Sequence, residues 1–246
     1  MYQFFVSPEN IQGKRVVISG RDVNHIKNVL RMKPGEEINV SNGEDGREYR
    51  CMIEELGEEV ICKLLFIKED AVELPSKIYL FQGLPKSDKM ELVIQKAVEL
   101  GVYEVIPVAM KRSIVKLDDK KAQSRVARWQ EISKAAAKQS KRAIVSNIHD
   151  IISFKEALAY AKDLDVKLIP YEMAEGMAHT RELIGAIKPG QSVGFIIGPE
   201  GGIDDEELEA AMAAGFESIT LGKRILRTET AGLTVLSILM YNLESE

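Results

Sequence analysis

The sequence predicts an α/β protein of two domains: a small, mostly β domain followed by a larger α/β domain. Up to about residue 70, short apolar runs alternate with turn signals, and the pair Asn42-Gly43 is typical of the turn between two antiparallel strands. After Lys77, apolar strand-like runs alternate with helical patterns, as in a sheet covered by helices. The segment around Pro75 is a plausible linker, so we place the domains at 1–72 and 73–246.

The first domain contains four strand-like runs and one helical run. The helical run is DVNHIKNVLRM (22–32), in which Val23, Ile26, Val29 and Leu30 recur at helical spacing and so define one face of the predicted helix. The strand-like runs are RVVIS (15–19), EEINVSNGEDG (36–46), EYRCMIEEL (48–56) and EEVICKLLFI (58–67).

The second domain contains alternating strands and helices. Two helices carry start signals, Asp88 with Glu91 and Ser153 with Glu156, and Gly101 stands where a helix-terminating glycine is expected. Further helices are predicted at 125–142, near Thr180, after Asp204 and at 232–243. The strand-like runs are KIYLFQGL (77–84), VYEVIPVAM (102–110), VKLIP (166–170), SVGFIIG (192–198) and SITLG (218–222).

The composition is that of a soluble globular protein, with 45% hydrophobic and 29% charged residues in 246. No apolar run reaches the length of a membrane span, and the first residues lack a secretory signal, so we expect no membrane association and a cytoplasmic location. Cys51 and Cys62 lack CxxC spacing, and the three histidines are scattered. We therefore expect buried thiols and no metal site.

Charge is distributed unevenly around a net charge of -5. Residues 111–142 contain eleven Lys and Arg against three acids, whereas residues 36–73 contain twelve acids against four bases. This separation suits a protein that presents one face to a polyanion and stays soluble.

The basic helix has an apolar side and a charged side. Val126, Trp129, Ile132 and Ala136 share one side, and Lys134, Lys138 and Lys141 lie opposite. Two interpretations stay open, a solvated face or sequence-independent binding to a nucleic-acid backbone, to which the nearby Lys111 and Arg112 would add.

The stretch IIGPEGGIDDEE (196–207) resembles a phosphate-binding loop but contains Glu200 where a cation is expected. No Lys or Arg occurs between Gly198 and Glu217, and neither common nucleotide fingerprint is present. It is therefore either a tight turn or a pocket for a neutral or cationic ligand that approaches the backbone closely.

Three segments follow strands of the second domain: 168–172, 196–202 and 221–231. Ligands of parallel α/β sheets bind at the carboxyl ends of strands, so these segments are predicted to converge. In the last of them, Thr228 or Thr230 is expected to cap the following helix, with Glu229 in its first turn.

Several motifs together resemble the RsmE-type 16S ribosomal RNA uridine N3-methyltransferases, over essentially the whole chain. The motifs are HIKNVLRM, LPKSDKMELVIQKAVELGV, KRSIVK, RWQEISKAAAKQSKR, GPEGGIDDEE and LGKRILRTETA. The resemblance implies a PUA-like RNA-binding β-barrel and a SPOUT-class α/β domain with a C-terminal trefoil knot. It also implies S-adenosylmethionine as cofactor, a homodimer, and a decoding-region uridine of 16S rRNA in the small (30S) subunit as target.

The resemblance also assigns residues. Arg227 and Glu229 are the candidates near the target base. Arg227 is expected to stabilise the oxyanion that develops at a flanking carbonyl, and Glu229 or Glu200 is expected to accept the proton if burial raises the pKa of its carboxyl. RNA contacts are expected from His25, Arg31, Lys86, Arg112, Lys134 and Lys138. The expected cofactor residues are Leu168, Tyr171, Gly198, Pro199, Glu200, Gly201, Leu221, Gly222, Ile225, Leu226 and Ala231.

One position departs from the family pattern, which commonly has Arg near the first strand where this chain has Gln3. If that Arg contacts RNA, one contact is lost here. Alternatives to the leading hypothesis are a SPOUT methyltransferase with a different RNA target and a non-catalytic RNA-binding or ribosome-assembly protein. An NTP-binding protein is disfavoured because a P-loop Lys is missing.

Overall fold

The structure is a computed structural model that describes residues 1–69, 72–115, 117–171 and 176–244. Contacts divide the chain into two compact units. Unit 1 comprises Met1–Glu73 and Ala137–Val145, and unit 2 comprises Leu74–Ala136 and Ser146–Glu246. The domain boundary between residues 72 and 73 stays a prediction; the units differ from it chiefly in grouping 137–145 with the N-terminal residues.

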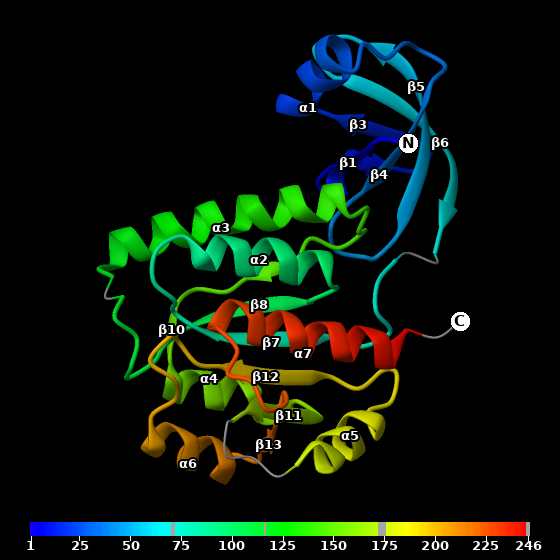
Figure 1. The fold of residues 1–246 in the computed structure, drawn as a ribbon. Coiled ribbons are helices and arrows are strands. Elements are labelled where there is room, and N and C mark those ends of the chain that lie inside the picture. The colour runs from blue at the N-terminus through cyan, green and yellow to red at the C-terminus, as the bar shows by residue number, and fades with distance from the viewer. Residues whose placement is uncertain (70–71, 116, 172–175, 245–246) are drawn as a thin grey trace. The chain divides into compact units, whose positions relative to one another are not determined.

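Unit 1 is built on a six-stranded sheet with the order β1-β4-β5-β6-β3-β2 (Figure 1). β1 and β4 pair in parallel, and the other pairs are antiparallel. Asn42-Gly43 connects the antiparallel strands β4 and β5, as predicted, within a loop in which Asn42 Oδ1 accepts the N–H groups of Glu44 and Asp45. The strands are β1 (Gln3–Phe5), β2 (Ile11–Gln12), β3 (Arg15–Ile18), β4 (Glu37–Ser41), β5 (Glu48–Leu56) and β6 (Val60–Lys68).

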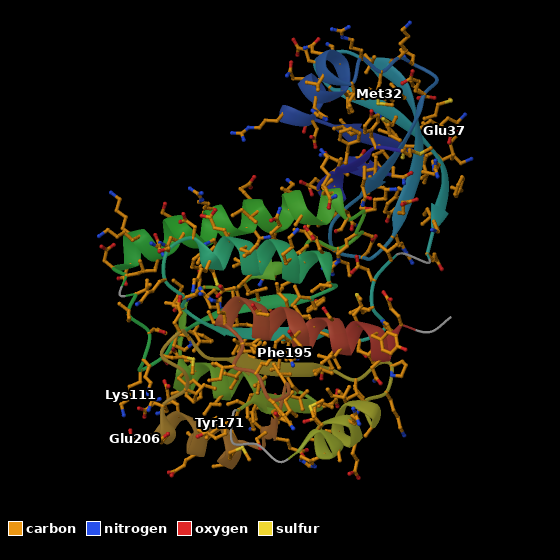
Figure 2. The ribbon with its side chains drawn as sticks, viewed as in Figure 1. Met32, Glu37, Lys111, Tyr171, Phe195 and Glu206 are labelled. Carbon is orange, nitrogen blue, oxygen red and sulfur yellow. The ribbon has the colours of Figure 1, made fainter. Side chains whose placement is uncertain are left out.

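The core of unit 1 is apolar and includes both cysteines. Cys51 and Cys62 are fully buried and unpaired as disulfides, and burial raises the pKa of each thiol to about 12. The prediction of buried thiols is confirmed. Figure 2 labels Met32, which lies in the same core.

The predicted helix of unit 1 is irregular. It consists of α1 (Arg21–Asn24) followed by the π-helix η2 (His25–Val29), in which Leu30 N–H donates to the His25 carbonyl. A π turn contains an extra residue and therefore shifts the phase of the side chains that follow. Val23 and Ile26 are buried as expected, but Val29 is 61% exposed, so its predicted place on the apolar face is wrong.

Residues 137–145 are tied to the rest of unit 1 by a buried ion pair. Arg142 is 3% exposed and its Nη2 lies 2.6 Å from Glu73 Oε2, while Glu73 Oε1 accepts the backbone N–H groups of Ala143 and Ile144. Gln3 is 4% exposed and donates to the Arg142 carbonyl at 2.6 Å. The residue that departs from the family pattern therefore faces the interior of unit 1.

Unit 2 is built on a parallel seven-stranded sheet with the order β10-β8-β7-β12-β11-β13, and β9 pairs with β8 off this path. The central strands are almost entirely buried, as expected for a sheet covered on both faces. The strands are β7 (Ile78–Gly83), β8 (Glu104–Ala109), β9 (Asn147–Ile148), β10 (Ile152–Ser153), β11 (Val166–Pro170), β12 (Val193–Ile197) and β13 (Glu217–Ile219).

Helices cover both faces of this sheet (Figure 1). Phe81 of β7 packs with Phe154 of α4 and Ala211 of α6, whereas its neighbour Leu80 faces Gly232 of α7. Successive residues of a strand point to opposite faces, so α4 and α6 lie on one face and α7, which packs on α2, lies on the other. The helices are α2 (Lys89–Glu99), α3 (Asp119–Gln139), α4 (Phe154–Tyr160), α5 (Met177–Gly185), α6 (Asp205–Ala213) and α7 (Thr228–Leu243); the short 3₁₀ helices are η1 (Pro8–Asn10) and η3 (Ala161–Asp163).

The helix starts agree with the sequence in part. Ser153 and Glu156 form the predicted capping box of α4, and Gly101 follows α2 with φ 89°. Asp88 stands at the N-cap of α2 but makes no side-chain capping hydrogen bond, so its predicted cap is wrong.

None of the helices in the described ranges is long and apolar enough to cross a membrane. The trefoil knot stays a prediction.

Candidate functional site

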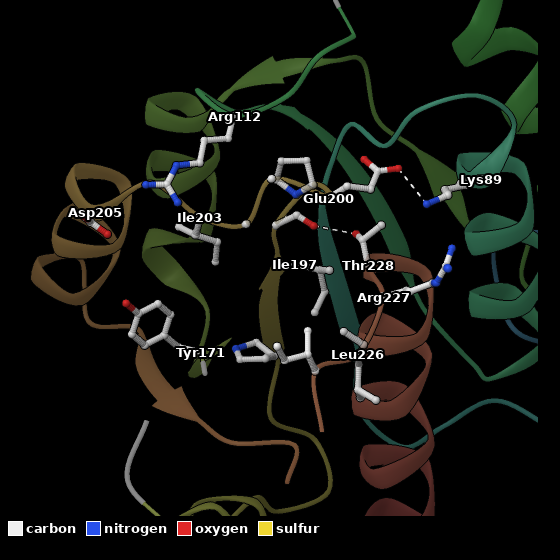
Figure 3. Close-up of a pocket in the computed structure, with 17 residues that line it drawn as sticks. Lys89, Arg112, Tyr171, Ile197, Glu200, Ile203, Asp205, Leu226, Arg227 and Thr228 are labelled. Atoms are coloured by element: carbon white, nitrogen blue, oxygen red, sulfur yellow. Dashed lines mark hydrogen bonds and ion pairs between the residues drawn. The ribbon is translucent and has the colours of Figure 1, made fainter. Parts of the chain in front are cut away.

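The loops after β11, β12 and β13 meet in unit 2, as their positions at the ends of parallel strands predict. They line a cavity of about 660 Å³, which we call the cleft (Figure 3). Its lining residues are Lys89, Arg112, Pro170, Tyr171, Ile197, Gly198, Pro199, Glu200, Gly201, Gly202, Ile203, Asp205, Ile225, Leu226, Arg227, Thr228 and Ala231.

The glycines of the GPEGG segment are needed for close approach of the chain to itself. A Cβ on Gly198 would lie 2.8 Å from Ile203 Cγ1, and one on Gly201 would lie 3.1 Å from Arg112 Cβ. Gly202 has φ 74°, a conformation that side chains disfavour. The loop is therefore folded tightly, and its backbone is exposed to the cleft.

The start of α7 is joined to this loop by Thr228. Its hydroxyl donates to the Gly198 carbonyl at 2.6 Å (Figure 3). The same hydroxyl accepts a hydrogen bond from Gln82 Nε2 at 2.9 Å. Neither Thr228 nor Thr230 caps the helix, because the N-cap residue is Arg227 and no side chain makes a capping bond there. The predicted threonine cap is wrong: tertiary contacts with strand β7 and the loop use the Thr228 hydroxyl instead.

One lysine of the cleft pairs with two carboxylates, Glu200 in the cleft and Glu229 at the start of α7. Lys89 Nζ lies 3.0 Å from Glu200 Oε1 and 3.4 Å from Glu229 Oε2. Glu200 also accepts the Lys86 backbone N–H. Burial by itself would raise the pKa of Glu200, but the contacts with Lys89 and with backbone N–H groups outweigh it and hold the pKa below its ordinary value. The condition set for Glu200 as proton acceptor, a pKa raised by burial, is therefore not met, because donors surround the carboxylate.

The acidic segment after the loop is compensated by cations from another part of the chain. Asp204 and Glu207 form a capping box at the start of α6, and Lys111 pairs with Asp204 at 2.9 Å and Glu206 at 3.0 Å (Figure 2). Arg112 lies 3.4 Å from Asp204. Residues 198–217 thus contain no cation of their own, but the fold brings Lys111 and Arg112, which follow β8, beside their carboxylates.

A second cavity of about 480 Å³ adjoins the cleft and shares Pro170, Tyr171, Ile225, Leu226 and Ala231 with it. Its other lining residues include Leu221 and Gly222. Every predicted cofactor residue except Leu168 lines one cavity or the other. Leu168 is 1% exposed within β11 and lines neither, since the cavities begin at Pro170, two residues further along.

The residues predicted to contact RNA are spread over both units. In unit 2, Lys86 and Lys134 are exposed, and Arg112 lines the cleft. In unit 1, Arg31 is exposed and His25 is half-buried. Lys138 pairs with Asp22 at 2.8 Å and lies 4.4 Å from the centre of the Phe4 ring, so its ammonium is engaged within unit 1.

Comparison with known proteins assigns the chain to a family. Residues 72–240 match the model of an RNA methyltransferase domain, and residues 18–65 match that of an RNA methyltransferase PUA domain. Ribosomal RNA small subunit methyltransferase E from Bacillus subtilis is 38% identical over 92% of this chain and 90% of its own length. This chain belongs to the ribosomal RNA small subunit methyltransferase E family. The same-named protein of Mesomycoplasma hyopneumoniae is 36% identical, over 96% of this chain and 98% of its own.

A solved structure of a methyltransferase E supports the assignment of the fold. The protein from Neisseria gonorrhoeae, determined bound to S-adenosylmethionine, superposes with a TM-score of 0.83 at 35% identity, covering 98% of this chain and 97% of that one. The predicted PUA-like domain and α/β methyltransferase domain are confirmed.

Sequence reasoning missed several residues of the cleft. Lys89, Ile203 and Asp205 line it without having been predicted. Lys89 stands inside the conspicuous LPKSDKME segment, but its partners Glu200 and Glu229 are far along the chain, so no local pattern indicates the contact. Among the described residues, no group of three or more His, Cys, Asp and Glu side chains could hold a metal ion.

Proposed function

We propose that this chain transfers a methyl group from S-adenosylmethionine to N3 of a uridine in the decoding region of 16S rRNA, on an assembled or nearly assembled small subunit. The observation that carries the proposal is the glycine-rich, carboxylate-containing cleft at the ends of three parallel strands. It occurs in a chain of the methyltransferase E family, a member of which was determined with this cofactor bound.

The residues of the cleft fit S-adenosylmethionine. That molecule carries a sulfonium and an ammonium group, which the Glu200 and Asp205 carboxylates of the cleft complement electrostatically. Gly198 and Gly201 leave backbone groups accessible, and Leu226 and Ile225 supply apolar surface. When bound, the cofactor supplies an electrophilic methyl group, whose S–C electron pair remains on sulfur as the new N–C bond forms.

The chain itself must handle the proton of the base. N3 of uridine carries hydrogen at neutral pH, so its bond to hydrogen breaks as the bond to carbon forms. We assign Glu229 as the acceptor, because it lies in the first turn of α7 directly after Arg227 and Thr228 of the cleft and its Oε2 is held by an ion pair with Lys89 and by no hydrogen bond among the described residues. Arg227 stands at the N-cap of α7, lines the same cleft and is assigned to stabilise negative charge on a flanking carbonyl.

The proposed RNA-binding residues are those whose charge is exposed: Lys86 and Lys134 in unit 2 and Arg31 in unit 1. Such contacts with phosphates position the RNA, whereas the cleft selects the base.

We also propose a homodimer. An apolar hollow between α2 and α7 includes Leu92, Leu233 and Ile238, and the neighbouring Tyr241 is 86% exposed. Exposed apolar surface of this kind is typical of protein interfaces. Sedimentation of the wild type and of Leu233→Lys checks the assignment; a monomeric wild type contradicts it.

The test of the function is methyl transfer from labelled S-adenosylmethionine to small subunits that lack the modification, followed by mass spectrometric nucleoside analysis. We expect the label in N3-methyluridine. Label in another nucleoside would indicate a methyltransferase with a different target. Cofactor binding without any transfer would refute the proposed substrate.

A further inference from the structure

A single lysine of the cleft pairs with two carboxylates from different parts of the chain: Glu200, which also lines the cleft (Figure 3), and Glu229 at the start of α7. Lys89 lies in the first turn of α2, Glu200 follows β12, and Glu229 is in the first turn of α7. The ammonium is 3.0 Å from Glu200 and 3.4 Å from Glu229, and all three side chains are more than two-thirds buried. The sequence analysis assigned no role to Lys89.

The two carboxylates are satisfied unequally. Both oxygens of Glu200 accept the Lys86 backbone N–H, at 3.0 and 3.3 Å, in addition to the contact with Lys89. Glu229 Oε2 is buried and makes no hydrogen bond within the described chain, its contact with Lys89 being an ion pair of longer distance. A buried carboxylate oxygen without a donor is costly, so the Lys89 ammonium at 3.4 Å is the group that compensates it.

We propose that Lys89 is a positioning residue for methyl transfer, which anchors the ionised Glu200 at the cleft and holds Glu229, the proposed proton acceptor, by its Oε2 oxygen. The inference rests on the proposed function and deepens it. One ammonium against two carboxylates leaves one negative charge in excess. That excess is removed when Glu229 takes the proton released from the base.

Two other charged residues that line the cleft take no part in the contact between Lys89 and the two carboxylates. Arg112 also lines the cleft but pairs with Asp204, and Asp205 belongs to the acidic start of α6. Contact with Glu200 raises the pKa of Lys89, which keeps the ammonium charged at neutral pH and unsuited to act as the base itself. Lys89 also lowers the pKa of Glu200, against the opposing effect of burial.

The experiment compares Lys89→Gln and Lys89→Arg with the matched control Lys96→Gln. Lys96 lies on the same helix and pairs only with Glu99 among the contacts described, away from the cleft. Cofactor affinity is measured by calorimetry. The rate at which label is transferred to unmodified small subunits, counted over all nucleosides, is measured across pH 5 to 9 and gives kcat. The carboxyl carbons of glutamate are followed by NMR in the protein alone, with Glu200 assigned from Glu200→Gln.

We expect Lys89→Gln to lower kcat about 100-fold, the size of a general-base contribution, with cofactor affinity within about threefold of the wild type. In the NMR experiment, Glu200 of this variant should titrate at a higher pH than in the wild type, because the ammonium that lowers its pKa is lost. Lys89→Arg should recover most of kcat, and Lys96→Gln should resemble the wild type in every measurement.

Three results would overturn the inference: wild-type kcat in Lys89→Gln, no recovery in Lys89→Arg, or an unchanged Glu200 titration in Lys89→Gln. If Lys89→Gln does not fold, the rate and Glu200 titration of Lys89→Arg against the wild type decide. Failure of the proposed function is seen separately, as label in a nucleoside other than N3-methyluridine or no transfer by the wild type. The NMR titration still tests Lys89 in both cases.

Discussion

The starts of α6 and α7 lie on the same cleft but satisfy their backbone groups in opposite ways. The N-terminus of α6 is capped by its own sequence: Asp204 and Glu207 form a capping box, and acidic residues fill the first turn. The N-terminus of α7 has no side-chain cap, and Thr228, which could have provided one next to it, is bonded to Gly198 and Gln82 instead.

This difference separates groups that the fold has already satisfied from groups that are left for a ligand. A capped helix start is complete without any partner, whereas an uncapped start leaves backbone donors accessible in the cleft. Arg227, Thr228 and Ala231 of the α7 start line the cleft, but only Asp205 of the α6 start does so. The α7 side is therefore the one on which we expect mutations to affect function more than stability.

The largest effect is expected when the loop that both helices adjoin is displaced. Gly198→Val places a Cβ 2.8 Å from Ile203 Cγ1, so the loop must shift and cofactor affinity should fall at least ~100-fold, without unfolding the protein. Calorimetric titration with S-adenosylmethionine measures this. The control is Gly185→Ala in α5, where a Cβ meets nothing within 4 Å. Normal affinity in Gly198→Val would show that the cofactor site is elsewhere.

A capping residue introduced at the N-cap of α7 would make its start resemble that of α6 and so tests the comparison between the two helices. Arg227→Ser puts a favoured capping residue at the N-cap, so the free energy of unfolding should rise by up to about 1 kcal/mol. The rate of methyl transfer should nevertheless fall about 100-fold, since the group assigned to stabilise the oxyanion is lost. Denaturant unfolding and single-turnover transfer measure the two quantities. A variant that is stabilised and fully active would refute the assignment of Arg227.

Removing the hydrogen bonds by which Thr228 joins the start of α7 to the loop and to β7 should lower both the stability of the protein and its affinity for the cofactor. Thr228→Val removes both hydroxyl hydrogen bonds but keeps the shape of the side chain, with an expected loss of about 1 to 2 kcal/mol in the free energy of unfolding and weaker cofactor binding. Thr228→Ser keeps the hydroxyl and serves as the control. Equal behaviour of the two variants would mean that the hydroxyl does not join loop and helix.

Removing the cap of α6 should affect stability alone. Asp204→Ala is expected to lower Tm by roughly 3 °C at neutral pH and to leave methyl transfer nearly unchanged. Hydrogen bonding to Lys111 holds the pKa of Asp204 below its ordinary value of 3.8. The stabilisation is thus fully present above about pH 4 and is lost as pH falls through the lower folded-state pKa. A Tm difference that grows on acidification would contradict this linkage.

The smallest effect is expected on the basic helix, where Lys134 is exposed and Lys138 is engaged. Lys134→Glu should weaken RNA binding and reduce the slope of log affinity against log salt by about 1. Lys138→Glu, which places a carboxylate beside Asp22, should chiefly destabilise unit 1. Binding measured between 50 and 200 mM salt tests this. An unchanged slope in Lys134→Glu would make that lysine an ordinary solvated residue.

The sequence by itself determined the properties that depend on near neighbours. The period of apolar residues placed the strands and helices of unit 2, the residues Ser153 and Glu156 placed a helix start, and the GPEGG and RTETA segments indicated the family. The order of strands and helices also located the cleft, because the carboxyl ends of parallel strands share one edge of a sheet.

Tertiary structure alone decided how polar groups with several available partners are paired. Thr228 bonds to the loop rather than capping its helix, Lys138 pairs with Asp22, and Lys89 joins Glu200 to Glu229. A hydroxyl, an ammonium or a carboxylate can bond to a partner that is near or distant in the sequence, so the sequence alone does not show which partner it uses. The pairing is fixed when folding buries the group beside a partner that the packing brings within reach.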